Sequence, residues 1–169
     1  MKAVLLWVRI AAGCLVAVAA FSTLHPAEPA RTLPAALAMP LGAVAGIALF
    51  CILGRARPAL PRVARDRAPV VAGTAGVILA WAAVEETLWR WLLVGVLIPR
   101  TGLVVAVPIS AAAFAAWHRR GRREHLLTGT VFGGLYAASG SLAAAVAAHA
   151  AYNVSIAATL ERRPSGAPA

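Results

Sequence analysis

Apolar residues gather along this chain into long runs that are separated by polar, proline-rich and arginine-rich segments. A run of roughly 20 apolar residues can cross a lipid bilayer as a helix. The pattern predicts six transmembrane helices, over Ala3–Leu24, Leu33–Leu53, Val71–Ile98, Gly102–Trp117, Leu126–Ala138 and Leu142–Leu160. The predicted fold class is therefore all-α, a polytopic membrane helical bundle that forms a single integral-membrane domain over residues 1–169.

Basic residues are concentrated in alternate loops of this predicted bundle. Lys2 begins the chain, and clusters of arginine follow the second, fourth and sixth runs, whereas Arg31 and Arg100 are the basic residues of the intervening loops. Cytoplasmic loops of membrane proteins carry an excess of Lys and Arg. The alternation predicts that both termini lie in the cytoplasm. The Ala- and Arg-rich composition is typical of a GC-rich bacterial genome, so a bacterial plasma membrane is expected.

Composition supports the membrane interpretation and excludes one other class. The chain is 61% hydrophobic with a mean hydropathy of +0.79, against about 45–50% apolar residues in soluble domains. A formal net charge of +10 suggests nucleic-acid binding, but these charges lie between apolar runs, so no nucleic-acid partner is expected. Cys14 and Cys51 lie inside apolar runs without metal-ligand spacing, and neither a disulfide framework nor a zinc site follows from them.

The start of the chain, the second apolar run and the last nine residues each support a separate structural prediction. Lys2 and Arg9 followed by Ile10–Phe21 also fit a signal peptide, although an anchored first helix is favoured because Arg9 can snorkel to the headgroups. Gly42 and Gly46 form a small-xxx-small face suited to close helix packing. Residues 161–169 are predicted to be a disordered tail.

Three charged residues lie inside the third apolar run, where an ionisable side chain costs a few kcal/mol and by default marks function or pairing. Glu86 and Arg90 are spaced i, i+4, which predicts an ion pair on one helix face. The pair either orients a site or binds a substrate carboxylate, and a purely structural salt bridge is equally natural. Glu85 points about 100° away around the helix and needs a polar partner from another helix.

Candidate partners for Glu85 lie on two other predicted helices. His118 ends the fourth run, and His149 and Asn153 share one face of the sixth. At about 1.5 Å per residue, Glu85 lies roughly 12 Å and Asn153 roughly 10 Å from the cytoplasmic surface. These residues therefore predict a polar cavity that opens to the cytoplasm, whereas His125 is expected to be a loop or interface residue.

Three motifs with a four-residue spacing lie on three different predicted helices: Glu85-Glu86-x-x-x-Arg90, Phe114-x-x-x-His118 and His149-x-x-x-Asn153. In their order, placement and separation they resemble the signature of the CPBP family. This family contains the CAAX proteases and bacteriocin-processing enzymes and is also called the ABI family of intramembrane glutamic proteases. The resemblance covers about residues 70–160, so these residues are expected to form a catalytic core.

The resemblance implies an endopeptidase that hydrolyses peptide bonds with an activated water and needs no cofactor. Glu85 matches the catalytic glutamate, which takes a proton from a water held between it and His118. His149 and Asn153 would supply N–H donors to the oxyanion. The supporting or substrate-binding residues are Glu86, Arg90, Phe114, which is expected to pack beneath His118, and Trp89, which shares the face of Glu85. The expected partners are a peptide or membrane-protein substrate and the lipid bilayer.

Other functions remain among the hypotheses. Glu85, His118 and His149 also suit a catalytic zinc ion, which usually takes three protein ligands and a water, although no HExxH motif is present. A non-catalytic membrane immunity or binding protein could use the same cavity, and a proton-coupled transporter also places acids in the membrane. Replacing Glu85 separates the catalytic hypotheses from the non-catalytic one.

Overall fold

The computed structural model describes residues 2–53 and 68–160, and within them every regular element is a helix. In chain order these are α1 (Lys2–Thr23), α2 (Ala35–Ile52), α3 (Ala68–Glu86), the π-helical segment η2 (Thr87–Val94), α4 (Gly95–Thr101), α5 (Leu103–Trp117), α6 (Arg122–Ser139) and α7 (Leu142–Leu160). The predicted all-α fold is confirmed. The arginines of the segment 54–67 and the predicted disordered tail 161–169 lie outside the described residues.

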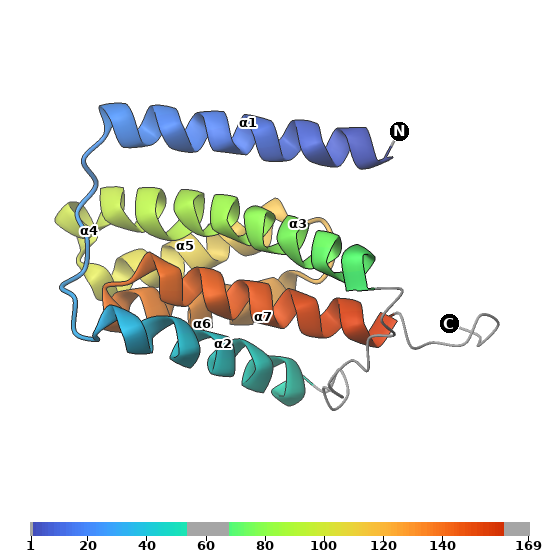
Figure 1. Cartoon of the computed structure of the whole chain (residues 1–169). Coiled ribbons are helices and arrows are strands. Elements are labelled where there is room, and N and C mark those ends of the chain that lie inside the picture. The colour runs from blue at the N-terminus through green and yellow to red at the C-terminus, as the bar shows by residue number, and fades with distance from the viewer. Residues whose placement is uncertain (1, 54–67, 161–169) are drawn as a thin grey trace.

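Each of the six predicted apolar segments forms a helical rod, and the third rod is the continuous succession of α3, η2 and α4. The rods run back and forth along the bundle, and α1 begins at the end at which α7 finishes (Figure 1). α6 begins at Arg122, four residues before the predicted start, because Gly121 supplies a left-handed turn with φ 67° directly before it. The last two arginines of that loop, Arg122 and Arg123, therefore belong to the helix, whereas Arg119 and Arg120 precede it.

Helices α2 and α7 pack closely through the predicted small-residue face. A Cβ atom added at Gly42 or Gly46 would collide with the carbonyl oxygens of Ala144 and Ala148 on α7. Backbones approach this closely only where side chains are absent. The prediction for these two glycines is confirmed, and their contact holds α7, which carries His149, against α2.

A second close contact, between α5 and α6, also depends on glycine residues. A Cβ atom at Gly129 would lie 3.2 Å from Phe114 Cδ1, and one at Gly133 would lie 2.9 Å from Val107 Cγ1. Phe132 and Tyr136 of α6 continue this contact into the hydrophobic core. The glycines therefore let the face of α6 that carries them lie directly on α5.

Apolar side chains also cover the outside of the bundle, where Leu15 is 71% and Val104 86% exposed. Among the described helices, Leu142–Thr159 is long and apolar enough to cross a membrane by length and composition. Ile10–Ala20, Ala36–Ile52 and Leu103–Trp117 are shorter apolar helices. An apolar exterior of this extent suits contact with lipid.

Candidate active site

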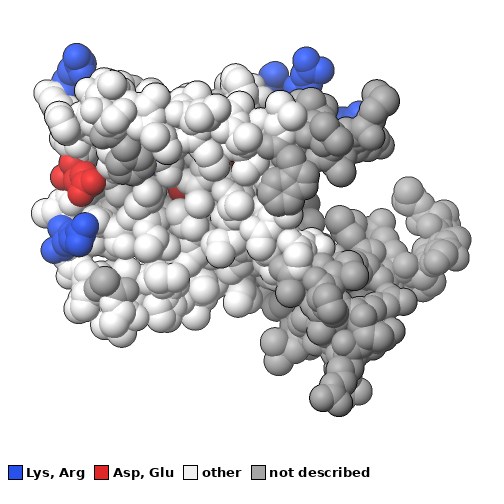
Figure 2. Space-filling view, turned by 45° about the horizontal axis from the view of Figure 1, so that its top comes forward, with Lys and Arg blue, Asp and Glu red and all other residues white. Residues whose placement is uncertain are grey.

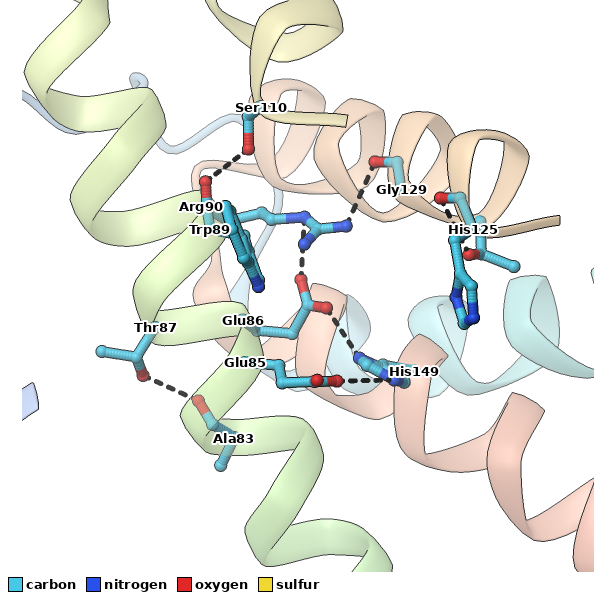
Figure 3. A network of polar contacts seen from close by, with 11 residues as sticks. Ala83, Glu85, Glu86, Thr87, Trp89, Arg90, Ser110, His125, Gly129 and His149 are labelled. Atoms are coloured by element: carbon cyan, nitrogen blue, oxygen red, sulfur yellow. Dashed lines mark hydrogen bonds and ion pairs between the residues drawn. The ribbon is translucent and has the colours of Figure 1, made fainter. Parts of the chain in front are cut away.

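The acidic doublet lies where the third rod changes its helical type. α3 ends at Glu86, and the π-helix η2 begins at Thr87. Ser110 of α5 donates its hydroxyl hydrogen to the Trp89 carbonyl oxygen of this π-helix at 2.6 Å (Figure 3). π-Helical turns are uncommon and often mark functional sites, and the sequence pattern had predicted an ordinary α-helix here.

The predicted ion pair between Glu86 and Arg90 is present and completely buried. Arg90 Nε lies 3.0 Å from Glu86 Oε2, with both side chains 0% exposed. Arg90 also donates through Nη2 to the Gly129 carbonyl oxygen of α6 at 3.2 Å, and its guanidinium carbon lies 4.9 Å from the centre of the Phe114 ring. Two helices and an aromatic face thus hold the arginine, which in turn holds the Glu86 carboxylate.

His149 of α7 links the two acids of the doublet. Its Nδ1 lies 2.8 Å from Glu86 Oε1 and its Nε2 lies 3.5 Å from Glu85 Oε2. Figure 3 shows the Glu86 carboxylate between Arg90 and His149, with Glu85 beside the same ring. The imidazole also stacks on Phe132, with ring centres 5.1 Å apart. The sequence placed His149 in the site but did not pair it with Glu86, because i, i+4 spacing reports contacts only within one helix.

The Glu85 carboxylate lies between two imidazoles from different helices. Its Oε1 is 3.8 Å from His118 Nε2, and its Oε2 is 3.5 Å from His149 Nε2. The side chains of Glu85 and His149 are 8% and 6% exposed, whereas that of His118 is 24% exposed. Glu85 therefore faces polar partners rather than lipid, and the site is most open at His118.

His118 is oriented from two sides. Its Nδ1 lies 2.8 Å from the Phe114 carbonyl oxygen, and since a carbonyl only accepts, Nδ1 carries the hydrogen and Nε2 faces Glu85. The ring lies edge-on to Phe114 at 4.6 Å and is stacked on His125 at 3.7 Å. Phe114 thus packs against His118 as expected.

His125, which the sequence analysis expects to be a loop or interface residue, lies in the first turn of α6 and stacks on His118, so it becomes a further candidate for the site. Gly121 reverses the chain in the left-handed conformation, so the first turn of α6 returns beside the end of α5. The short segment His118–His125, with a glycine in its middle, was the available indication.

The remaining predicted site residues are Trp89 and Asn153. Trp89 is half-buried, and its ring centre lies 5.9 Å from that of Phe114 and 6.3 Å from that of Trp117. It therefore packs against Phe114, the ring that contacts His118. Asn153 lies one turn beyond His149 on α7 and is partly exposed. Within the described ranges, no group of three or more His, Cys, Asp or Glu side chains is arranged to hold a metal ion.

Comparison with known proteins gives a match over the part of the chain that carries these residues. Residues 67–155, more than half of the 169-residue chain, match the family model described as Type II CAAX prenyl endopeptidase Rce1-like. No curated protein and no solved structure matches the chain. The matched segment runs from the start of α3 into α7 and includes all three motifs.

Proposed function

The chain belongs to the Rce1-like family of type II CAAX prenyl endopeptidases, which are membrane-embedded CAAX-type proteases, and on this premise we propose that Glu85 activates a water molecule for peptide-bond hydrolysis. The observation that supports this role most directly is the position of its carboxylate, whose two oxygens each face one imidazole, at 3.8 and 3.5 Å. A buried carboxylate between two such groups is suited to hold and return a proton.

In the proposed reaction, Glu85 and His118 hold the attacking water together. His118 carries its hydrogen on Nδ1, which lies 2.8 Å from the Phe114 carbonyl oxygen, so its Nε2 accepts one water hydrogen while Glu85 accepts the other. Glu85 removes its proton as the water oxygen bonds to the substrate carbonyl carbon. The proton then passes to the amide nitrogen as the C–N bond breaks, and this leaves a free acid and a free amine.

His149 is proposed to stabilise the oxyanion of the tetrahedral intermediate through Nε2–H. Its Nδ1 is 2.8 Å from the Glu86 carboxylate, and this contact orients the ring so that Nε2 faces the Glu85 carboxylate at 3.5 Å. Asn153, one turn further along α7, is proposed as the second donor. Preorganised donors of this kind are each worth about 10²–10³ in rate.

Glu86 and Arg90 are proposed to orient His149 rather than to bind a substrate carboxylate. Both side chains are 0% exposed, and Arg90 is further held by the Gly129 carbonyl oxygen. A substrate carboxylate would have to enter this fully buried place and compete with Glu86 and the Gly129 carbonyl oxygen for Arg90. The arrangement therefore favours the role of orienting the site over that of binding a substrate carboxylate.

The substrate is proposed to enter beside His118, whose side chain is 24% exposed, against 8% for Glu85 and 6% for His149. His118 is followed directly by the arginine-rich turn before α6, and such turns mark the cytoplasmic side. The proposed arrangement is six crossings of a bacterial plasma membrane as a single domain, with both termini and the opening of the site in the cytoplasm. The substrate is then a peptide or a membrane-anchored protein whose cleavage site can reach this opening.

The first test is the pair of variants Glu85→Gln and Glu124→Gln, purified in detergent. Each is incubated with a proteome-derived peptide mixture, and new peptide ends are identified by mass spectrometry. We expect Glu85→Gln to lower the rate at which new ends form by about 10²–10⁴ and Glu124→Gln, at the start of α6, to leave it unchanged. Equal rates in wild type and Glu85→Gln, with matching melting temperatures, would refute the mechanism.

The same assay distinguishes a zinc-dependent protease from the proposed metal-free mechanism. Glu85, His118 and His149 are the ligands that the zinc hypothesis requires, although among the described residues no such group is arranged to hold a metal ion. A zinc enzyme loses activity with 1,10-phenanthroline and regains it on addition of zinc, whereas the proposed mechanism predicts an unchanged rate and no stoichiometric zinc by elemental analysis.

A further inference from the structure

A cavity of about 360 Å³ lies at the end of the bundle opposite to His118, between the segment that joins α1 to α2 and the turn between α6 and α7. Its polar lining comes from Glu28, Arg31, Trp91, Tyr136 and Ser141. Figure 2 shows acidic and basic groups near each other at one end of the molecule, with further basic groups at the opposite end. The volume is that of a site for a small molecule or a headgroup, and none of these residues belongs to the proposed catalytic group.

The walls of this cavity are fixed by backbone contacts. Ala27 N–H donates to the Gly95 carbonyl oxygen at 3.1 Å, and Thr32 N–H donates to the Ser139 carbonyl oxygen at 3.3 Å. A Cβ atom at Gly140 would lie 2.6 Å from the Ala30 carbonyl oxygen. The segment that joins α1 to α2 can therefore pack this closely on the α6–α7 turn only because residue 140 is a glycine. A ligand would thus meet a preorganised wall, which reduces the entropic cost of binding.

Two polar groups of the lining point to a ligand with a hydrogen-bond donor. Trp91 Nε1–H donates to Glu28 Oε1 at 3.0 Å, which orients the carboxylate and leaves its second oxygen for another donor. Tyr136 is 1% exposed, and within the described residues its hydroxyl has no hydrogen-bond partner. A buried hydroxyl without a partner is unfavourable, so a group that bonds to it from the cavity gains stabilisation.

Other groups of the lining suit an anion. Arg31 also lines the cavity, as do Leu142 and Ala143, the first residues of the 19-residue helix α7. The N–H groups at a helix N-terminus and an arginine together favour a phosphate. The cavity therefore offers both an acceptor for a cation and donors for an anion.

We propose that this cavity binds the headgroup of an ethanolamine phospholipid, with its primary ammonium between Glu28 and Tyr136 and its phosphate toward Arg31 and the start of α7. The family is membrane-embedded, and Trp and Tyr side chains are typical of the headgroup level. A primary ammonium donates up to three hydrogen bonds, whereas the trimethylammonium of choline donates none. The proposal does not depend on peptidase activity.

The test measures lipid binding by native mass spectrometry and by the melting temperature of the protein in detergent. Ethanolamine, choline and glycerol phospholipids with the same acyl chains are added to wild type, Glu28→Gln, Tyr136→Phe and the control Glu124→Gln. We expect wild type and Glu124→Gln to retain the ethanolamine lipid at least tenfold more tightly than the other two. Glu28→Gln and Tyr136→Phe should lose this preference while folding normally.

Three results would overturn the proposal. One is equal retention of the three lipids by wild type, and another is an unchanged preference in both cavity variants. The third is that soluble phosphoethanolamine raises the melting temperature at the same concentration as the lipid, because the cavity would then take a soluble amino phosphate. Tyr136→Phe keeps the ring and removes one oxygen, so the proposal stays testable if Glu28→Gln does not fold.

Discussion

Arg90 is the largest completely buried side chain among the described residues. Its burial is possible because its charge is paired with the Glu86 carboxylate. The Gly129 carbonyl oxygen accepts from Arg90, Arg90 pairs with Glu86, and Glu86 bonds to His149. A buried charge without a partner is strongly destabilising. The chain of contacts therefore stabilises the fold and orients the imidazole at once.

Replacing Glu86 with Gln tests this chain of contacts at the residue scale. The variant leaves the Arg90 charge buried without its carboxylate, which typically costs about 3–5 kcal/mol. We expect a large drop in melting temperature, measured in detergent, together with reduced peptidase activity. Glu124→Gln, which removes a partly exposed carboxylate, serves as the control. Similar melting temperatures for the two variants would contradict the structural role of the pair.

His125 is expected to position His118 through ring stacking, at a centre-to-centre distance of 3.7 Å. His125→Ala removes the stacked ring and should lower kcat by about ten- to a hundredfold, since small displacements of a catalytic group have effects of this size. His125→Phe restores a flat ring and should recover most of the rate, with KM unchanged in both variants. A role limited to folding would instead lower the amount of active enzyme without changing kcat per folded molecule.

At the scale of elements, two irregular features place the site residues. The π-helix η2 follows the acidic doublet directly, and the Ser110 hydroxyl of α5 is bonded to its Trp89 carbonyl oxygen. The close approach of α2 to α7 sets the position of the helix that carries His149. Both features depend on small side chains at the contact.

The α2–α7 contact is tested by Gly46→Ala, with Gly134→Ala as the control. A Cβ atom at Gly46 collides with the Ala148 carbonyl oxygen, whereas a Cβ atom at Gly134 meets nothing within 4 Å. Overpacking of this kind costs about 1–3 kcal/mol, so we expect a lower melting temperature for Gly46→Ala. Gly134→Ala should be neutral or slightly stabilising, because alanine is the better helix former. Equal melting temperatures would show that the helices separate without cost.

At the scale of the whole molecule, the two ends of the bundle differ in chemistry. The proposed catalytic group opens beside His118 at the end that carries the arginine-rich turn, and the second cavity lies at the other end, lined by Glu28 and Arg31. α1 begins and α7 finishes at the first of these ends (Figure 1). In the proposed topology that end is cytoplasmic.

Reporter fusions test this topology. Green fluorescent protein, which fluoresces in the cytoplasm, is fused to either terminus, and alkaline phosphatase, which is active outside it, is fused after Thr101 between α4 and α5. We expect fluorescence from both terminal fusions and phosphatase activity from the internal one, because the arginine clusters favour the cytoplasmic side. Fluorescence at one terminus and not at the other would show an odd number of crossings.

Much of this protein follows from the sequence because hydrophobic length and helical spacing are local properties. The six apolar segments, the Glu86–Arg90 pair and the small-residue face of Gly42 and Gly46 all depend on neighbours within one helix. The structure contains each of them, with helix ends within four residues of the prediction. The motif order further indicated the family that the comparison then established.

Only the tertiary structure decided which polar groups from different helices meet. Helical periodicity tells which residues share a face, but the rotation of each helix about its axis is set by packing against its neighbours. The bond from His149 to Glu86, the stacking of His125 on His118 and the position of Glu85 between two imidazoles all depend on that rotation. The second cavity likewise exists because residues far apart in the chain, Glu28, Trp91 and Tyr136, are brought to one end of the bundle.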